Sequence, residues 1–129
     1  MPMAMRFPWA AFAAAGLLVQ PLHASGATWT PTRADVARIE AGLKLPTVPT
    51  PSGPLKDYER YYAGIVQNGH RMIRAEFVAL DIDPQARGQV HITSEDKFPV
   101  IMDGGCGIVS LLYDVEAKRV VSIGCNGLA

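Results

Sequence analysis

The sequence predicts an α+β fold in which one N-terminal helix packs on a curled antiparallel sheet of about four strands. Three observations indicate this fold. Apolar residues recur at helical spacing across residues 31–43, Asn68 and Gly69 form a tight-turn dipeptide between two strand-like runs, and a second pair of strand-like runs ends at Cys125. One helix followed by consecutive strands is typical of a two-layer domain with a shared hydrophobic core.

The first residues have the features of a secretory signal peptide. Arg6 precedes an apolar run at residues 9–19, and Ala24 and Ala27 are small residues after which cleavage can occur. A positive start, a short apolar middle and a small-residue cleavage site define such a signal. We expect cleavage near Ala24, because it lies closer to the apolar run. The alternative is a buried N-terminal helix of the mature fold.

Removal of residues 1–24 leaves residues 25–129, which are enough for one small domain and not for two. The apolar run is shorter than the roughly 20 residues that a membrane-spanning helix needs, so we expect no permanent membrane anchor. The run is not followed closely by a cysteine that could carry a lipid. The expected location is therefore the periplasm or the medium.

The charges of the chain balance and do not cluster. There are 12 Lys and Arg residues against 12 Asp and Glu residues, so the formal net charge is zero. Proteins bind nucleic-acid phosphates with basic patches. We therefore expect no nucleic-acid partner.

Residues 31–43 are predicted to form the helix. Thr30 or Thr32 can cap its N-terminus, and Pro31 fits a first helical position. The apolar positions at helical spacing, which we expect to be buried, are Val36, Ile39 and Leu43. Four prolines and a glycine then make residues 46–54 an extended connector that carries the chain away from the helix.

The dipeptide Asn68 and Gly69 predicts a long β-hairpin with a two-residue turn. This turn pairs Tyr62 with Ala75. One face of the hairpin then collects the side chains that we expect in the core: Tyr58, Tyr62, Val66, Ile73, Ala75, Phe77 and Ala79. The alternative is a helical turn or two at residues 55–63, where the apolar residues also fit helical spacing.

Four short segments follow the hairpin. Residues 83–88 predict a turn, because Asp-Pro and a later Gly favour chain reversal. Residues 89–93 alternate as a short strand with its two aliphatic residues inward. Residues 94–97 indicate a polar turn, and a proline makes residues 98–102 an edge segment of the sheet.

Cys106 and Cys125 are the only cysteines, and we expect them to form a disulfide in an oxidising compartment. A four-residue loop at 114–117 sets Tyr113 opposite Lys118 in the last hairpin. Cys106 then lies directly opposite Cys125, within reach of a bridge. Closing a loop of about 20 residues stabilises a fold by about 3 kcal/mol. The alternatives are a reactive thiol and a thiolate metal site.

The order of elements, one helix followed by a meander of strands, resembles the cystatin-like arrangement between residue 31 and Cys125. The resemblance is topological, and the chain carries no inhibitor motif. A second resemblance is to a family of small exported bacterial proteins of uncharacterised function. It is carried by three segments: Asp103, Gly104, Gly105 and Cys106; Tyr113 and Asp114; and Cys125, Asn126 and Gly127. This second resemblance implies export and a disulfide.

One group of candidate binding residues opens a glycine-rich segment. These residues are Asp103, Gly104 and Gly105. Their backbone can direct N–H groups at an anion or let a partner approach closely. The alternative is a tight turn into the last hairpin that lets Cys106 reach its partner, because phosphate-binding loops need a following helix and this segment has none.

Three residues of the first hairpin complete the candidate set. Alternation leaves Tyr61 as the one tyrosine of this strand that faces away from the core, and Asn68 and His70 lie at the hairpin tip. Aromatic side chains are enriched in protein interfaces. We therefore expect binding at the sheet face or at the hairpin tips, which are residues 67–70 and 114–118.

Catalytic and metal-binding patterns are not readable from residue spacing. His70 and His91 have no partner at ligand spacing, so we expect surface histidines. The Asp-x-Asp at residues 81–83 fits a turn better than a cation site, and the neighbours Glu95 and Asp96 point opposite ways in an extended segment. We expect no cofactor and no metal.

These observations favour a non-catalytic binding or inhibitor module whose partner is another envelope or extracellular protein or a small ligand. One alternative is a small hydrolase that uses His70 or His91 with a carboxylate such as Asp103 or Glu76. A histidine nitrogen within hydrogen-bond reach of a carboxylate in a deep pocket would favour that enzyme. Another alternative is an accessory subunit of an envelope assembly, which predicts an exposed apolar patch.

Overall fold

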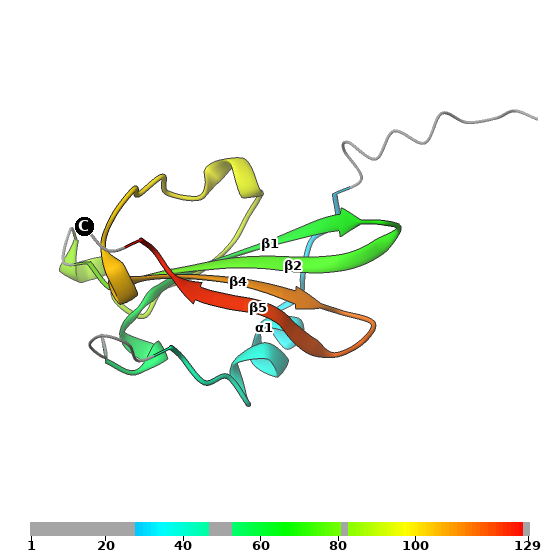
Figure 1. Ribbon diagram of the computed structural model, residues 1–129, viewed down its shortest axis with the longest axis horizontal. Coiled ribbons are helices and arrows are strands. Elements are labelled where there is room, and N and C mark those ends of the chain that lie inside the picture. The colour runs from blue at the N-terminus through cyan, green and yellow to red at the C-terminus, as the bar shows by residue number, and fades with distance from the viewer. Residues whose placement is uncertain (1–27, 47–52, 81–82, 128–129) are drawn as a thin grey trace, which may run out of the picture.

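The computed structural model describes residues 28–46, 53–80 and 83–127. These residues form an α+β fold with one helix and one five-stranded sheet (Figure 1). The elements are α1 (Arg33–Glu40), β1 (Glu59–Gln67), β2 (His70–Val78), β3 (Val90–Ile92), β4 (Ile108–Asp114) and β5 (Arg119–Cys125). The expected signal peptide, much of the proline-rich connector and Asp81 lie outside the described residues.

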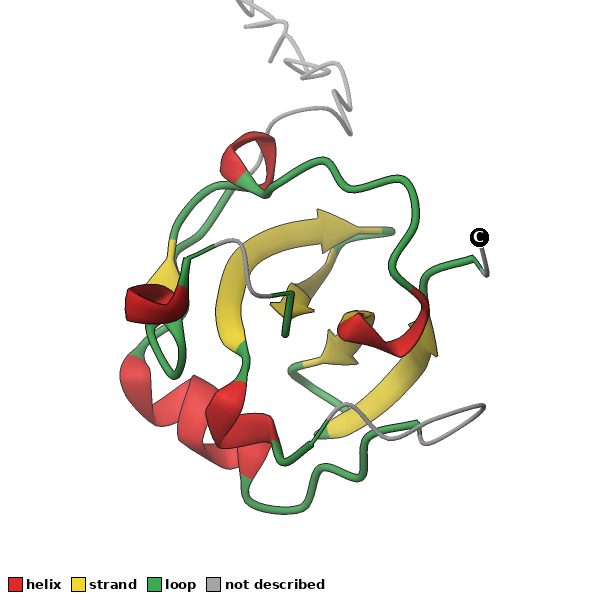
Figure 2. Ribbon diagram, turned by 90° about the vertical axis from the view of Figure 1, so that its left-hand side faces the viewer, coloured by secondary structure: helices red, strands yellow, loops and turns green. Residues whose placement is uncertain are grey.

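The sheet is mixed, with the strand order β3-β1-β2-β4-β5. It curls without closing, and β3 and β5 are its edge strands (Figure 2). We expected about four antiparallel strands; the structure has five, and β3 pairs with β1 in parallel. After β2 the chain passes to the free edge of β1 and enters β3. β3 runs opposite to β2, as β1 does, so β3 and β1 are parallel. The predicted strand at residues 89–93 is confirmed as β3.

The helix α1 begins at a capping box. Thr32 Oγ1 accepts a hydrogen bond from Asp35 N, and the Asp35 carboxylate accepts one from Thr32 N. This reciprocal contact satisfies backbone donors at the helix start. Thr32 is therefore the cap, and Pro31 lies before it rather than at the first helical position. The helix ends at Glu40, earlier than predicted, because Gly42 follows closely and has low helix propensity.

The β1–β2 hairpin has the predicted register. Tyr62 pairs with Ala75, and the turn consists of Asn68 and Gly69, with φ values of 51° and 77°. Two consecutive positive φ values define a turn that Asn and Gly adopt at little cost. The helical alternative is confined to Leu55–Asp57, a short 3₁₀ turn after which β1 follows.

The hydrophobic core lies between α1 and one side of the sheet, which we call the helix side. Its buried members are Val36, Ile39, Tyr58, Tyr62, Ile73, Ala75, Phe77, Val109, Leu111 and Tyr113. Leu43 and Ala79 pack against this cluster. Five of the seven hairpin residues expected in the core are among its buried members, and Val66 is half-buried. The predicted face of the hairpin is therefore correct.

A polar contact fastens α1 to β1 on the helix side. Tyr62 Oη donates to Glu40 Oε1 over 2.5 Å, and Arg60 Nε lies 3.3 Å from the same oxygen. The Tyr62 side chain is fully buried. Burial, followed by the hydrogen bond to Glu40, raises the pKa of the Tyr62 phenol. The phenol therefore remains a hydrogen-bond donor at neutral pH.

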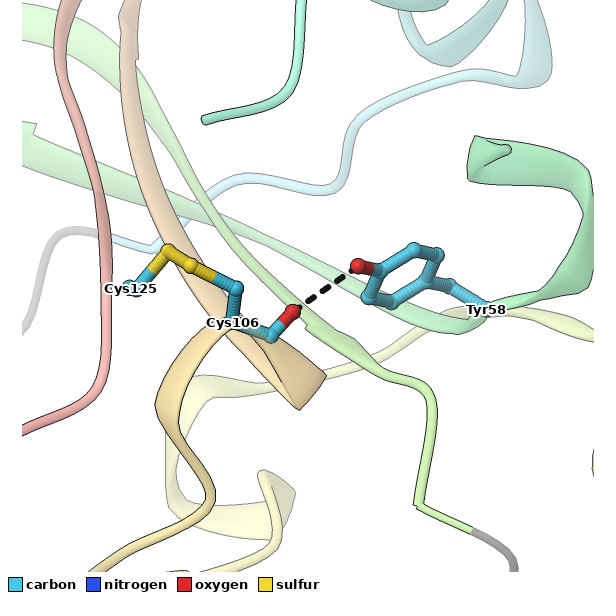
Figure 3. Close-up of a disulfide and its surroundings, with 3 residues drawn as sticks. All are labelled: Tyr58, Cys106 and Cys125. Carbon is cyan, nitrogen blue, oxygen red and sulfur yellow. Dashed lines mark hydrogen bonds between the residues drawn. A yellow bond between two sulfur atoms is a disulfide. The ribbon is translucent and has the colours of Figure 1, made fainter. Parts of the chain in front are cut away.

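The disulfide between Cys106 and Cys125 is confirmed, with 4.5 Å between the two Cα atoms (Figure 3). The predicted register of the last hairpin is wrong. Cys125 pairs with Val109, and a bulge interrupts the ladder between β4 and β5. Cys106 reaches its partner from the 3₁₀ turn Gly105–Gly107 that precedes β4, not from a paired strand position.

Two features account for the shifted register. Lys118 has a φ of 53° and belongs to the turn, so the loop covers residues 115–118 rather than 114–117. The bulge also gives one strand an extra residue. A hydrogen bond from the core also fixes the backbone beside the disulfide: Tyr58 Oη donates to Cys106 O over 2.8 Å (Figure 3).

Residues 98–102 do not form the expected edge segment of the sheet. They belong to a loop that passes over the side of the sheet opposite α1 (Figure 1). The edge of β1 is instead extended by Trp29, which forms a bridge with Gly64 and donates from Nε1 to Ile65 O over 3.0 Å. A Cβ atom on Gly64 would overlap the Trp29 backbone, so this position requires glycine.

Candidate binding surface on the outer side of the sheet

We call the side of the sheet opposite α1 the outer side. Alternation along β1 directs Glu59 and Tyr61 to this side, while Tyr58 and Tyr62 enter the core. Tyr61 pairs across the strands with Glu76 of β2. A strand with one buried and one solvated face gives this division, which the sequence pattern predicted.

Glu59 Oε1 lies between two aromatic groups. Tyr61 Oη donates to it over 2.5 Å, and His91 Nε2 lies 2.9 Å from it. The Tyr61 and His91 rings stack with their centroids 4.7 Å apart. Burial, together with the hydrogen bond to Glu59, raises the pKa of Tyr61 to about 12. The phenol therefore stays protonated and donates a hydrogen bond at neutral pH, and Glu59 holds both rings in place.

Glu76 is a half-buried carboxylate beside this cluster. Burial raises the pKa of Glu76, and the charge of Arg74 opposes that shift. Arg74 Nε lies 2.6 Å from Glu95 Oε1, an ion pair without a well-aligned hydrogen bond. Arg74 is therefore shared between two carboxylates. A group that donated hydrogen bonds to Glu76 would be favoured here.

The loop that crosses the outer side is attached to the sheet at several points. The Phe98 ring lies 5.9 Å from the Tyr61 ring, centroid to centroid. Asn126 Nδ2 donates to Ile101 O over 2.8 Å and to Asp103 O over 3.2 Å. Asn126 directly follows Cys125, so the disulfide restrains the position of Asn126. The side chain of Asn126 in turn fixes the loop by its hydrogen bonds.

Two side chains of this loop point into solvent. Val100 is 89% exposed and Met102 is 82% exposed, while Ile101 between them is half-buried. Among the described residues, the other exposed large aliphatic side chains are Val120 and Val121 of β5. The loop therefore exposes the apolar side chains of Val100 and Met102, while Phe98 and Asn126 attach its backbone to the sheet.

Two pockets lie beside the loop and share Pro99 and Ile101 as a wall. The larger has a volume of about 370 Å³ and is lined by Arg74, Glu76, Glu95, Asp96, Phe98, Pro99, Val100, Ile101 and Asn126. The smaller has a volume of about 280 Å³ and is lined by Glu59, Tyr61, Val78, Leu80, Asp83, Ala86, Pro99 and Ile101. Carboxylates outnumber cationic groups in both pockets, so both favour a cationic group with apolar neighbours.

The glycine-rich candidate residues lie where this loop joins β4. Gly104 has a φ of 115°, and a Cβ atom there would lie 2.9 Å from Ile108 Cγ1. The Gly105 carbonyl accepts a hydrogen bond from Asn126 N, and the Asp103 carbonyl accepts one from the Asn126 side chain. These contacts match the alternative in which the segment is a tight turn into the last hairpin.

The other candidates do not converge on one site. Tyr61 lines the smaller outer pocket, whereas Asn68 and His70 lie at the tip of the first hairpin. His70 Nδ1 lies 2.8 Å from Glu116 Oε2 in the turn of the last hairpin, and both side chains are exposed. The hydrogen bond that the Glu116 carboxylate accepts from His70 raises the pKa of His70. This pair joins the two hairpin tips.

The histidine partners differ from those expected. The alternative enzyme hypothesis named a carboxylate such as Asp103 or Glu76; the structure has Glu116 beside His70 and Glu59 beside His91. Glu59 lines the smaller outer pocket, but His91 does not belong to its lining. The enzyme hypothesis requires a histidine beside a carboxylate inside a deep pocket. The structure has the histidine–carboxylate contact but does not place the histidine in the pocket lining.

Sequence reasoning missed the residues that organise this surface. Alternation along the strand directs Glu59 to the outer side with Tyr61, but its contact with His91 depends on the parallel pairing of β3, which residue spacing does not predict. The bond from Asn126 to the loop spans 25 residues, and no local pattern signals it. Val100 and Met102 were placed in an edge segment, so their exposure was not expected.

No group of three or more His, Cys, Asp or Glu side chains is placed to hold a metal ion within the described residues. In the same part of the chain, no helix is both long and apolar enough to span a membrane. No protein-family model, no curated protein and no solved structure matches the chain.

Proposed function

We infer that the chain is a non-catalytic binding module whose outer side docks on another protein. One observation carries this inference: Val100 and Met102 are exposed on a loop that Phe98 and Asn126 fix to the sheet. Single exposed aliphatic residues are ordinary on protein surfaces. A fixed loop, however, loses little conformational entropy on binding, which favours affinity.

The surroundings of the loop indicate the chemistry of the partner. Glu76, Glu95, Asp96 and Asp103 lie along or beside it, and Arg74 is paired with Glu95. A complementary partner has an apolar depression for Val100 and Met102, with basic residues around it. Opposite charges at the rim of an interface accelerate association and make it sensitive to salt.

The proposal is tested by capture of partners from the cell envelope with the mature protein. Val100→Ser combined with Met102→Ser removes the apolar pair without touching the core, so we expect capture to fall at least tenfold. Val121→Ser is the matched control, because Val121 is 51% exposed on β5, outside the loop. We expect this control to capture as much partner as the unmodified protein.

The thermal midpoint of each variant shows whether the fold is intact. If the double variant folds normally and still captures the same protein, the outer loop is not the docking surface. If the Val121→Ser control loses capture equally, the contact is not specific to the loop. The captured protein also shows whether the chain serves as an accessory subunit of an envelope assembly.

A second candidate function, a small hydrolase, rests on the contact between His91 and Glu59. A histidine held by a carboxylate can act as a general base. Hydrolysis of p-nitrophenyl acetate by the purified protein tests this function. Under the enzyme hypothesis His91→Gln abolishes the activity and His70→Gln preserves it, whereas the binding-module hypothesis predicts no activity in any of the three proteins.

Export to the periplasm or the medium is part of the proposal. The disulfide supports it, because structural disulfides persist in oxidising compartments. N-terminal sequencing of the protein from an envelope fraction is expected to begin near Ser25. Full-length protein in the cytosol would contradict export. We also retain the cystatin-like order of elements as a proposal about the fold.

A further inference from the structure

We propose that a second site, on the helix side of the molecule, binds a small amphiphilic anion, meaning one anionic head group joined to an apolar tail. The site is a cleft between the end of α1 and the start of β5, with a volume of about 390 Å³. Small-molecule pockets commonly have volumes of about 300–1,000 Å³. The cleft lies apart from the outer loop and does not depend on the protein-binding function.

The rim of the cleft is basic. Arg38, Lys118 and Arg119 line it, and no carboxylate does. Among the described residues, Lys118 and Arg119 have no carboxylate within ion-pairing distance. Arg38 is 53% exposed and lies 3.4 Å from Asp35 across one helical turn. Lys118 is therefore available to an anion, whereas Arg119 lies directly opposite Asp114 in the β4–β5 ladder.

The acidic side chains of the neighbouring turn are engaged elsewhere. Glu116 Oε2 contacts His70, and Asp114 Oδ1 accepts hydrogen bonds from Glu116 N and Ala117 N. Glu116 is therefore directed at His70 rather than at the rim of the cleft, and one oxygen of Asp114 is held by the turn. An added anion would face cationic groups first.

The floor of the cleft is apolar. Ile39 and Tyr113 are 4% and 7% exposed, and Leu43 and Val120 form the sides. Val120 is 37% exposed, so the cleft leaves aliphatic surface in contact with water. A bare inorganic anion would leave this surface uncovered. A ligand with an apolar tail would remove it from water, which is favourable.

The conformation of Lys118 supports a role for its side chain. Its φ of 53° lies in the left-handed region, where Gly or Asn costs less than Lys. The turn itself gains nothing from lysine at this position. The side chain at the cleft rim gives a reason for lysine there that the backbone does not.

Decanoate is the probe that tests the site, with methyl resonances observed by NMR spectroscopy of the mature protein. We expect saturable shifts of Ile39, Leu43 and Val120 at submillimolar decanoate. Octyl glucoside, which lacks the charge, and inorganic phosphate, which lacks the tail, are expected to bind at least tenfold more weakly. Shifts spread over the whole surface, or equal binding of phosphate, would overturn the proposal.

Two variants separate binding from stability. Lys118→Gly relieves the left-handed conformation, so the fold is expected to be as stable or more stable, while decanoate affinity falls about fivefold to tenfold. Combining it with Arg119→Gln is expected to lower the affinity further. Lys44→Gln is the control, because Lys44 is exposed and does not line the cleft. Unchanged affinity in Lys118→Gly would contradict the site.

The same anionic chemistry occurs in free amphiphiles and in lipid head groups. A cleft of about 390 Å³ has the size that holds one small molecule, so we expect the mature protein to remain in the supernatant when sedimented with vesicles of phosphatidylglycerol. If the protein sediments with the vesicles and the Lys118→Gly variant does not, the cleft binds lipid head groups at a membrane surface. That result would overturn the free-ligand proposal.

Discussion

Tyr61 and Tyr62 are neighbours in β1, and each donates a hydrogen bond to a glutamate, yet they belong to different environments. Tyr62 is fully buried on the helix side and fastens Glu40 of α1 to the sheet. Tyr61 is half-buried on the outer side, contacts Glu59 and lines a pocket. The same chemical pair thus joins two layers on one side and forms part of the proposed contact surface on the other.

The difference indicates which side of this small domain contributes more to the stability of the fold. The helix side is closed by α1, and the largest fully buried side chains include Tyr58, Tyr62 and Phe77. The outer side is covered by loops; Met72, Val78 and Ile108 are buried beneath them, while charged groups such as Glu76 remain half-exposed there. Substitutions at the half-exposed positions of the outer side are therefore expected to affect folding less than substitutions beneath α1.

The largest expected effect is that of removing each tyrosine side chain. Tyr62→Ala opens a cavity beneath α1, and we expect a loss of about 3–5 kcal/mol in the free energy of unfolding. Tyr61→Ala is expected to cost about 1 kcal/mol, because solvent can fill the space. Urea unfolding followed by circular dichroism measures both. Equal losses would end the distinction between the two sides.

The disulfide connects the two regions, and its removal gives the next effect. Cys106→Ala combined with Cys125→Ala is expected to cost about 2–4 kcal/mol of unfolding free energy. The variant should also increase amide exchange in residues 101–105 more than in α1, because Asn126 loses its fixed neighbour. Hydrogen exchange with mass spectrometry measures this. Uniform acceleration across the chain would show that the bridge does not brace the loop specifically.

Loss of the phenol oxygen alone gives a smaller and sharper contrast. Tyr62→Phe removes the hydrogen bond from a buried phenol to the charged Glu40 and leaves that carboxylate with Arg60 as its partner, so we expect a cost of about 1.5–3 kcal/mol. Tyr61→Phe leaves Glu59 in contact with His91 and water, and we expect less than about 0.5 kcal/mol. Chemical unfolding at pH 7 compares the two variants. A larger loss in Tyr61→Phe would reverse the interpretation.

The smallest effect concerns the hairpin tips, which belong to neither side. The pKa of His70 is raised from 6.5 by Glu116, so the folded state binds the proton more tightly than the unfolded state. The resulting stabilisation is present below pH 6.5 and is lost as the pH rises through the folded-state pKa. Thermal midpoints between pH 5 and pH 8 should show this slope, and His70→Gln should remove it. An unchanged slope in the variant would assign it to another group.

Local patterns predicted much of the helix side. The Asn68 and Gly69 turn determined the register of the first hairpin, and alternation then placed Tyr58, Tyr62 and Phe77 in the core. Both signals are local, since a two-residue turn leaves one register and strand side chains alternate. The capped helix start at Thr32 was open to two choices, which the capping box resolves.

The outer side was less predictable because it depends on contacts between distant segments. The parallel pairing of β3 with β1 brings His91 to Glu59, and the bond from Asn126 fixes the loop. Neither contact can be predicted from the spacing of residues in the sequence. The disulfide was predicted from compartment and composition, but the bulge in the last hairpin made the predicted pairing of Cys106 wrong.

The most direct test is photo-crosslinking in the cell envelope with p-benzoylphenylalanine placed at one of two exposed positions. Position 100 lies on the outer loop, and position 33 begins α1 on the helix side. The proposal predicts a discrete crosslinked protein from position 100 that is absent from position 33 and decreases at high salt. A crosslinked partner from position 33 alone would contradict the assignment of binding to the outer side.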